Sequence, residues 1–180
     1  MLAGYTAAYV SGGHTGLAAY DGPEGRASFA DDMRQLIQRA TAFTILAPAL
    51  VGYLDGFPAT RLPLVDEIFY WTAVSAGSAK IVSVHHLVVY RPGASEVWIA
   101  DKTIYASRYL DAGLLAIALY DAPDGAGYYA IAGSRIMASR LGGVAGTVLR
   151  RQVQRSAADT VKMYLEWVRD SLAQAGPAPH

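Results

Sequence analysis

The chain has no cysteine among its 180 residues, which excludes disulfides, thiolate metal sites and cysteine nucleophiles. Charge is also scarce, because charged residues make up 17% of the sequence and the formal net charge is +0. Soluble domains usually carry about 25% charged residues. Since a neutral chain lacks a global field that attracts nucleic acid, we expect no nucleic-acid partner. The apolar share of 53% argues against disorder and indicates a large core or an apolar binding face.

Long hydrophobic runs are missing as well. The longest apolar stretches, at 43–54 and 112–120, fall short of the ~20 residues that a membrane-spanning helix needs. The first residues have no basic segment, so we expect no signal peptide. The expected location is the cytoplasm, or outside it if a further segment precedes Met1. The length suits one domain, which we place at residues 1–175, with a disordered tail at 176–180.

The spacing of apolar residues predicts helices first and strands afterwards. Residues 2–10 fit a short helix or a strand, and helices are predicted at 29–40 and 49–54. Aromatic and β-branched runs joined by short turns predict an antiparallel meander. Its five strands are expected at 66–74, 80–91, 96–110, 113–121 and 128–139. An apolar stripe from Thr147 onward predicts a long amphipathic helix.

The predicted fold class is therefore α+β, with N-terminal helices, a five-stranded curved antiparallel meander and a long C-terminal amphipathic helix. This order of elements resembles that of the START-like helix-grip proteins, which carry lipids and small molecules. The resemblance concerns the fold and does not by itself establish a function.

Strand 96–110 carries many polar side chains for so apolar a chain. Strict alternation places Asp101, Thr103, Tyr105, Ser107 and Tyr109 on one face. Lys102 and Arg108 then lie on the other face, outside any pocket that the first face lines. The first face is either a solvent-facing surface or the polar side of a pocket, and a β-bulge would invert the assignment.

The histidines do not form a metal-binding pattern. His85 and His86 are adjacent in a predicted strand, so they point to opposite faces and cannot bind one ion together. No pair of histidines has the spacing of a zinc motif, and we expect no metal and no cofactor. A serine hydrolase would need Ser134 with His86 and Asp101, but the GxSxG motif is absent.

One basic concentration lies at the start of the last predicted helix. Its arginines are either solvated or a contact for phosphate headgroups at a membrane surface. The concentration comprises Arg135, Arg140, Arg150, Arg151 and Arg155, of which the last three are the expected membrane contact.

Four segments of the strand region are similar, in order, to a family of uncharacterised bacterial proteins. These segments are DEIFYWTA, VSVHHLVVYRPG, ADKTIYASRYLDAGL and GSR. The family shows a Tyr-Trp-Ser strand, a Thr-His-Val strand and a Ser-Lys-x-x-Tyr-Ala-Ser-His-Tyr motif. The resemblance implies an architecture and candidate positions, but no reaction. The matching residues are Tyr70, Trp71, His86, Lys102, Tyr105, Ser107, Tyr109, Ser134 and Arg135.

Two positions depart from that family pattern. Arg108 stands where the family shows histidine, and Ala132-Gly133 stands where it shows Asn-Arg. A histidine pair that included position 86 in relatives would therefore be incomplete in this chain.

Apolar residues on both faces of several strands lead us to expect a non-enzymatic carrier or sensor of a hydrophobic or amphipathic, lipid-like molecule. We expect its cavity between the meander and the C-terminal helix. The expected wall residues are Phe69, Trp71, Val88, Trp98, Leu115, Ile117, Tyr129 and Ile131. The expected ligand-binding residues are Trp71, His86, Trp98, Tyr105, Tyr109, Tyr129 and Arg135.

Two alternatives stay open at this point. In the first alternative, the chain is an enzyme in which His86 is the general acid or base and Tyr105 and Arg135 polarise a carbonyl or phosphate. In the second alternative, the chain is a structural or interaction domain without a cavity. The oligomeric state is not indicated by the sequence.

Overall fold

The computed structural model describes residues 2–17, 20–22, 25–76, 79–107, 112–125, 127–137, 162 and 166. The chain divides into two compact units, Met1–Arg140 and Leu141–His180. In the second unit, Lys162 and Glu166 are helical, and their charged groups lie 3.9 Å apart at i, i+4. The rest of the predicted C-terminal helix, its three arginines and the tail lie outside the described residues.

The first unit opens with helices. They are α1 (Leu2–Gly12), the 3-10 turn η1 (Gly13–Gly16), α2 (Phe29–Gln38), α3 (Thr41–Leu46) and α4 (Pro48–Gly56). Residues 2–10, which fitted a helix or a strand, are thus helical. A small hairpin of β1 (Tyr20–Gly22) and β2 (Gly25–Ala27), which was not predicted, precedes α2.

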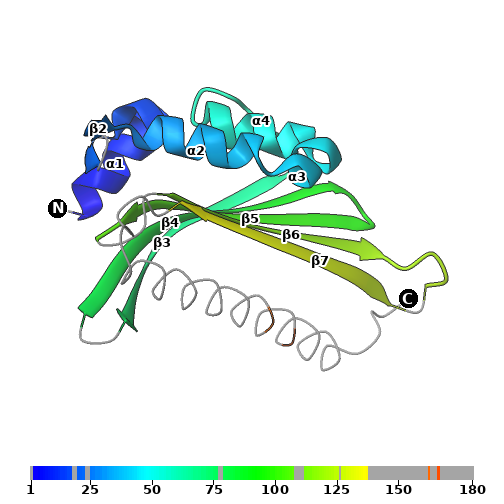
Figure 1. Cartoon of the computed structure of the whole chain (residues 1–180). Helices are drawn as coiled ribbons and strands as arrows, with labels where there is room; N and C mark the ends of the chain where they lie inside the picture. The colour runs from blue at the N-terminus through cyan, green and yellow to red at the C-terminus, as the bar shows by residue number, and fades with distance from the viewer. Residues whose placement is uncertain are drawn as a thin grey trace. The chain divides into compact units, whose positions relative to one another are not determined.

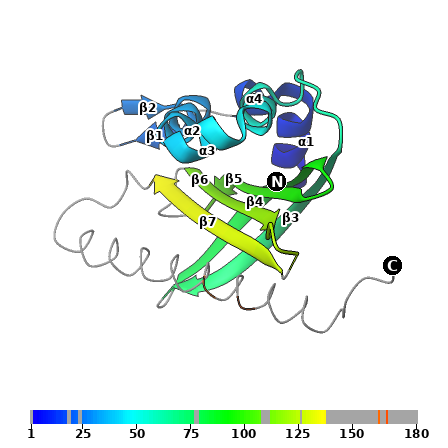
Figure 2. The same cartoon turned by 90° about the vertical axis from the view of Figure 1, so that its right-hand side faces the viewer.

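A five-stranded antiparallel sheet follows, in the order β3-β4-β5-β6-β7. The strands are β3 (Val65–Ala76), β4 (Ala79–Gly93), β5 (Glu96–Ala106), β6 (Ala112–Asp121) and β7 (Tyr128–Met137). The predicted meander is therefore confirmed. The observed strand ends lie within two residues of the predicted ones, except that the third strand ends at Ala106 and not at residue 110. Figures 1 and 2 show the helices gathered on one face of this twisted sheet.

The core lies between that helical layer and the sheet. In α2, Phe29, Met33, Leu36 and Ile37 are buried, which is the i, i+4, i+7, i+8 spacing of a helix with one apolar face. From the sheet, Val88, Trp98, Ala100 and Leu114 are buried beneath the helices. The apolar stripe of α2 therefore fixes which face of the sheet is covered.

The division of strand 96–110 by strict alternation is wrong at Tyr105, because the bulge that would invert the assignment is present. The β4–β5 register shifts between Val84 and His85, so His85 pairs with Thr103 but Val84 pairs with Tyr105. This bulge places the extra residue, Ile104, between two pairs and turns Tyr105 toward the helices, where its ring meets Tyr5 at 5.1 Å.

The pocket interpretation of this strand left Lys102 outside the pocket, whereas the structure places Lys102 in the core. Its side chain is fully buried on the helix-facing side of the sheet. The amine bonds to groups from η1 and α4, which satisfy it there. Strand β5 ends at Ala106, and residues 108–111, including Arg108 and Tyr109, lie outside the described residues.

Candidate functional site

A cavity of about 470 Å³ lies between the segment that carries α3 and the helix-facing side of β5–β7. It exists because β6 and β7 present small residues there, namely Ala116, Ala118 and Gly133. Phe43 and Trp98 close one side, with ring centroids 5.7 Å apart. Ligand sites of proteins commonly have volumes of about 300–1,000 Å³ and mostly apolar walls. This hollow therefore has the size and the lining of a small-molecule site.

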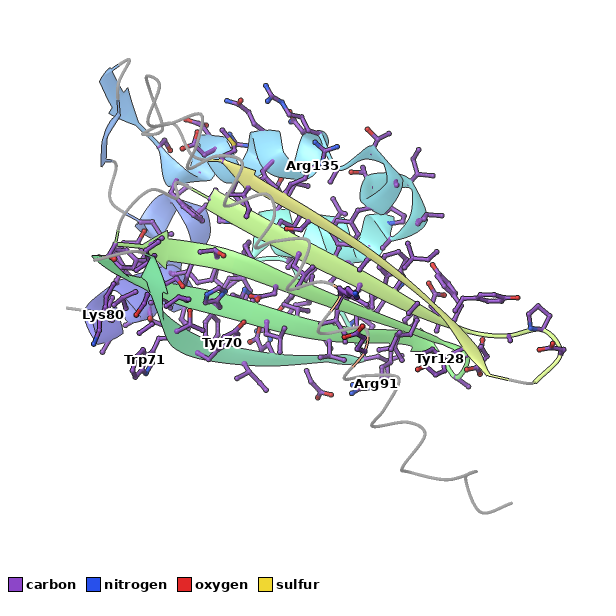
Figure 3. All side chains as sticks on the ribbon, turned by 60° about the horizontal axis from the view of Figure 1, so that its bottom comes forward. Tyr70, Trp71, Lys80, Arg91, Tyr128 and Arg135 are labelled. Carbon is purple, nitrogen blue, oxygen red and sulfur yellow. The ribbon has the colours of Figure 1, made fainter. Side chains whose placement is uncertain are left out.

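Polar groups of α3 and β7 also line this cavity. Thr41, Ser134 and Arg135 line it, and Arg135 is exposed on edge strand β7. Figure 3 shows Arg135 on this edge strand of the sheet. Arg135 forms no ion pair with any residue that the structure describes. The cavity thus combines an apolar interior with one cation that is available to an anion.

A buried polar network occupies a second place between the sheet and the helices. His86 Nδ1 lies 3.1 Å from the Tyr9 hydroxyl, and its Nε2 lies 3.0 Å from Glu67 Oε2. The Tyr53 hydroxyl donates to the same Glu67 oxygen at 2.5 Å. The His86 ring is stacked on Phe69 with centroids 4.5 Å apart, which fixes its orientation.

Lys102 extends this network toward η1 and α4. Its Nζ lies 3.0 Å from His14 Nε2 and donates to the Leu54 carbonyl at 2.8 Å. The amine also lies 5.0 Å from the centre of the Tyr9 ring, within the range of a cation–π contact. Every buried side-chain nitrogen and oxygen in the described part of the chain has a hydrogen-bond partner.

Burial shifts the protonation of these groups toward their neutral forms. Burial, assisted by the Lys102 charge, lowers the pKa of His14 to about 3 and that of His86 to about 4. Burial also lowers the pKa of Lys102 to about 7, against the opposing effect of Asp55 and Glu67. Burial raises the pKa of Tyr9 above its usual range. The network therefore consists of neutral imidazoles around an amine whose protonation is disfavoured by burial.

The other face of the sheet carries a second histidine cluster. His85 lies between Ser83 Oγ at 2.9 Å and Asp101 Oδ1 at 3.1 Å. Tyr70 stacks on His85 with centroids 4.7 Å apart and donates its hydroxyl to Asp101 Oδ2 at 2.6 Å. Figure 3 looks onto this face and shows Tyr70 on it. His85 and His86 thus lie on opposite faces, as the sequence predicted.

The comparisons with known proteins are negative. No protein-family model, curated protein or solved structure matches this chain.

The structure separates the residues expected to bind a ligand. Trp98 and Arg135 line the cavity, whereas His86 is fully buried in the polar network. Trp71 and Tyr129 are 67% and 60% exposed. Of the other expected wall residues, Ile131 lines the cavity and Val88 is part of the packed core. The expected cavity beside the C-terminal helix lies outside the described residues.

The expected catalytic trio does not converge. His86 pairs with Lys102, Lys102 with Leu114, and Leu114 with Arg135, so three strand spacings separate His86 from Arg135. Neighbouring strands lie about 4.8 Å apart, which places these two residues about 14 Å apart across the sheet. Tyr105 packs against Tyr5 instead. His86 as general acid or base stays a prediction, but its full burial argues against direct contact with a substrate.

Sequence reasoning missed the partners in both histidine clusters. Tyr9, Tyr53 and Glu67 gave no signal, because Tyr9 and Glu67 contact His86 across 77 and 19 residues and Tyr53 joins the network only through Glu67. Ser83 and His85 did carry a signal, since residues two apart in a strand share a face. The hydrolase considered from the sequence paired Asp101 with His86, whereas the structure pairs it with His85.

Two further features are absent from the described residues. These residues contain no group of three or more histidine and acidic residues that could hold a metal ion. None of the described helices is long and apolar enough to cross a membrane.

Proposed function

We propose that this chain binds a small amphipathic anion, with the apolar body in the α3–β7 cavity and the anionic group at Arg135. The observation that carries the proposal is the hollow of about 470 Å³ itself, since a domain built only for packing would fill it. The proposal keeps the expected carrier or sensor of lipid-like molecules but moves its site to the N-terminal helices.

The chemistry of the lining supports both parts of the ligand. Burying apolar surface stabilises a complex by about 25 cal/mol per Å², so ~150 Å² of ligand contributes about 4 kcal/mol. Arg135 adds a charge-assisted hydrogen bond, which favours a carboxylate or phosphate over a neutral headgroup.

The test uses decanoate, decyl phosphate and decanol, with calorimetry and tryptophan fluorescence as readouts. We expect the two anions to bind more tightly than decanol. Ala118→Phe should weaken all three at least tenfold, because the added ring occupies the cavity. Arg135→Gln should remove the preference for anions and leave decanol binding unchanged.

Two matched variants control this experiment. Ala73→Phe adds the same ring at an exposed strand position, and Arg91→Gln removes an exposed arginine that pairs with Asp66. Both should bind like the parent chain. Absence of binding by all three probes at millimolar concentration, or unchanged binding by Ala118→Phe, would overturn the proposal.

A further inference from the structure

Ser83, His85 and Asp101 form a chain of hydrogen bonds on the sheet face opposite the helices. Ser83 Oγ lies 2.9 Å from His85 Nε2, and His85 Nδ1 lies 3.1 Å from Asp101 Oδ1. One imidazole nitrogen therefore faces a hydroxyl and the other faces a carboxylate. This is the order nucleophile, base, orienting acid that activates serine in acyl-transfer enzymes.

Sheet geometry explains how these side chains meet. Ser83 and His85 are two residues apart in β4 and share a face. His85 pairs with Thr103 and Leu87 pairs with Asp101, so Asp101 is the diagonal neighbour of His85 on the next strand. The bulge lies immediately beside His85, between this pair and the next one, Val84–Tyr105. The arrangement thus needs both the alternation of β4 and the register of β5.

Tyr70 fixes the carboxylate and the ring together. It pairs with His85 across β3–β4, stacks on the imidazole with an interplanar angle of 13°, and donates to Asp101 Oδ2. Asp101 therefore has one oxygen held by Tyr70 and the other facing His85. The His85 Nδ1 then carries the proton, and its Nε2 is left to accept the proton of Ser83.

We propose that Ser83 is a nucleophile for acyl transfer from small esters, with His85 as its general base and Asp101 as the positioning residue. Ser83 Oγ attacks the carbonyl carbon while its proton passes to His85 Nε2. The ester C–O bond breaks, and His85 returns this proton to the leaving alkoxide. Water then attacks the acyl-serine, His85 takes the proton of that water, and Ser83 recovers it as the acid leaves.

Thr72 completes the site. Its hydroxyl lies 2.7 Å from Ser83 Oγ and 3.4 Å from His85 Nε2. A donor beside the attacking oxygen can stabilise the negative charge that develops on the carbonyl oxygen. Ser83 itself is 6% exposed, which suits a short acyl group and a compact leaving group better than a large substrate.

The experiment treats the full chain with a fluorophosphonate probe, whose phosphorus bonds to an activated serine oxygen as fluoride leaves. We expect one adduct, at Ser83. Trypsin does not cut before Pro92, so the peptide of residues 81–102 carries Ser83 together with the turn residue Ser95. Fragmentation of this peptide distinguishes the proposed nucleophile from an ordinary exposed serine.

Variants then test the roles. Ser83→Ala should abolish labelling, and Asp101→Asn and His85→Gln, which keep the shapes of the side chains, should slow it at least tenfold. Thr72→Val should slow hydrolysis of p-nitrophenyl butyrate by about tenfold. Ser75→Ala, at an exposed position of β3, should label and hydrolyse like the parent chain.

The result that would overturn the proposal does not depend on any variant folding. An unmodified Ser83 in the folded parent chain, after exposure that fully labels a known serine hydrolase, would exclude it. Equal labelling of Ser83 and Ser95 would also exclude it. The cluster and the anion cavity lie on opposite faces of the sheet, so failure of either proposal leaves the other standing.

Discussion

Lys102 places an amine in the core, and its protonation couples to folding. Burial lowers the pKa of Lys102 to about 7, whereas an unfolded lysine titrates near 10.4. Between these values the unfolded chain binds a proton that the folded chain does not. The free energy of unfolding therefore increases with pH in this window, by at most about 1.4 kcal/mol per pH unit.

We predict that Lys102→Met removes this pH dependence. The quantity to measure is the difference in unfolding free energy between the parent chain and the variant, by urea unfolding from pH 7 to 9.5. Taking this difference cancels the contribution of the tyrosines to the pH dependence, because both chains contain the same tyrosines and these also titrate toward high pH. Lys80→Met, at an exposed position of β4, should keep the dependence. If the unfolding free energy of Lys102→Met increased with pH as much as that of the parent chain, the Lys102 amine would not be the cause of the dependence.

Helix α1 is held to the sheet largely by two tyrosines. Tyr5 donates to the Ile104 carbonyl at 3.1 Å, and the fully buried Tyr9 bonds His86 and stacks on Phe57 at 5.1 Å. Together these contacts join the first element of the chain to β4 and β5, which follow about 80–100 residues later.

We predict a graded loss of stability at Tyr9. Tyr9→Phe keeps the ring but leaves a His86 nitrogen without a partner, which should cost about 1–3 kcal/mol. Tyr9→Ala also creates a cavity and should cost about 3–5 kcal/mol. Urea unfolding measures both, and Tyr129→Phe, at a 60% exposed position, should change stability by less than ~0.5 kcal/mol. Equal losses for Tyr9→Phe and Tyr9→Ala would show that packing of the ring contributes nothing.

At the level of elements, periodicity was enough to find the strands but not how their faces are used. Alternation correctly placed His85 and His86 on opposite faces, because the extra residue of the bulge lies in β5 and leaves the alternation of β4 unbroken here. It failed for Tyr105, since one extra residue at Ile104 reverses every later side chain. A bulge leaves no mark on a run such as TIYAS, whose residues all suit a strand.

The candidate sites were harder to predict than the strands, because they depend on register between strands. The cavity comes from Ala116, Ala118 and Gly133 lying next to one another across β6 and β7, opposite Phe43. In the sequence these are ordinary small residues in apolar runs. Arg135, which the sequence analysis expected to bind a ligand beside the C-terminal helix, lines the cavity on the α3 side, and its distance from His86 emerges only from three successive strand pairings.

In the first unit as a whole, the helices and the sheet are joined through two neutral histidines. His14 comes from η1 and meets Lys102 of β5, while His86 of β4 meets Tyr9 of α1 and Glu67 of β3. Burial and the Lys102 charge lower the pKa of His14 to about 3 and that of His86 to about 4. Protonating either ring would place a second cation beside the buried amine.

We therefore predict that this unit loses stability as the pH falls from 6.5 toward 4. In that window the unfolded chain protonates both histidines and the folded chain does not, so stability falls with falling pH. Each histidine contributes at most about 1.4 kcal/mol per pH unit. The glutamines of His14→Gln and His86→Gln do not titrate in this window. Each variant should therefore lower the slope of the unfolding free energy against pH by the contribution of about one proton. Circular dichroism at pH 7.5 confirms that both variants fold, and a double variant with the same slope as the parent chain would assign the acid sensitivity to the carboxylates instead.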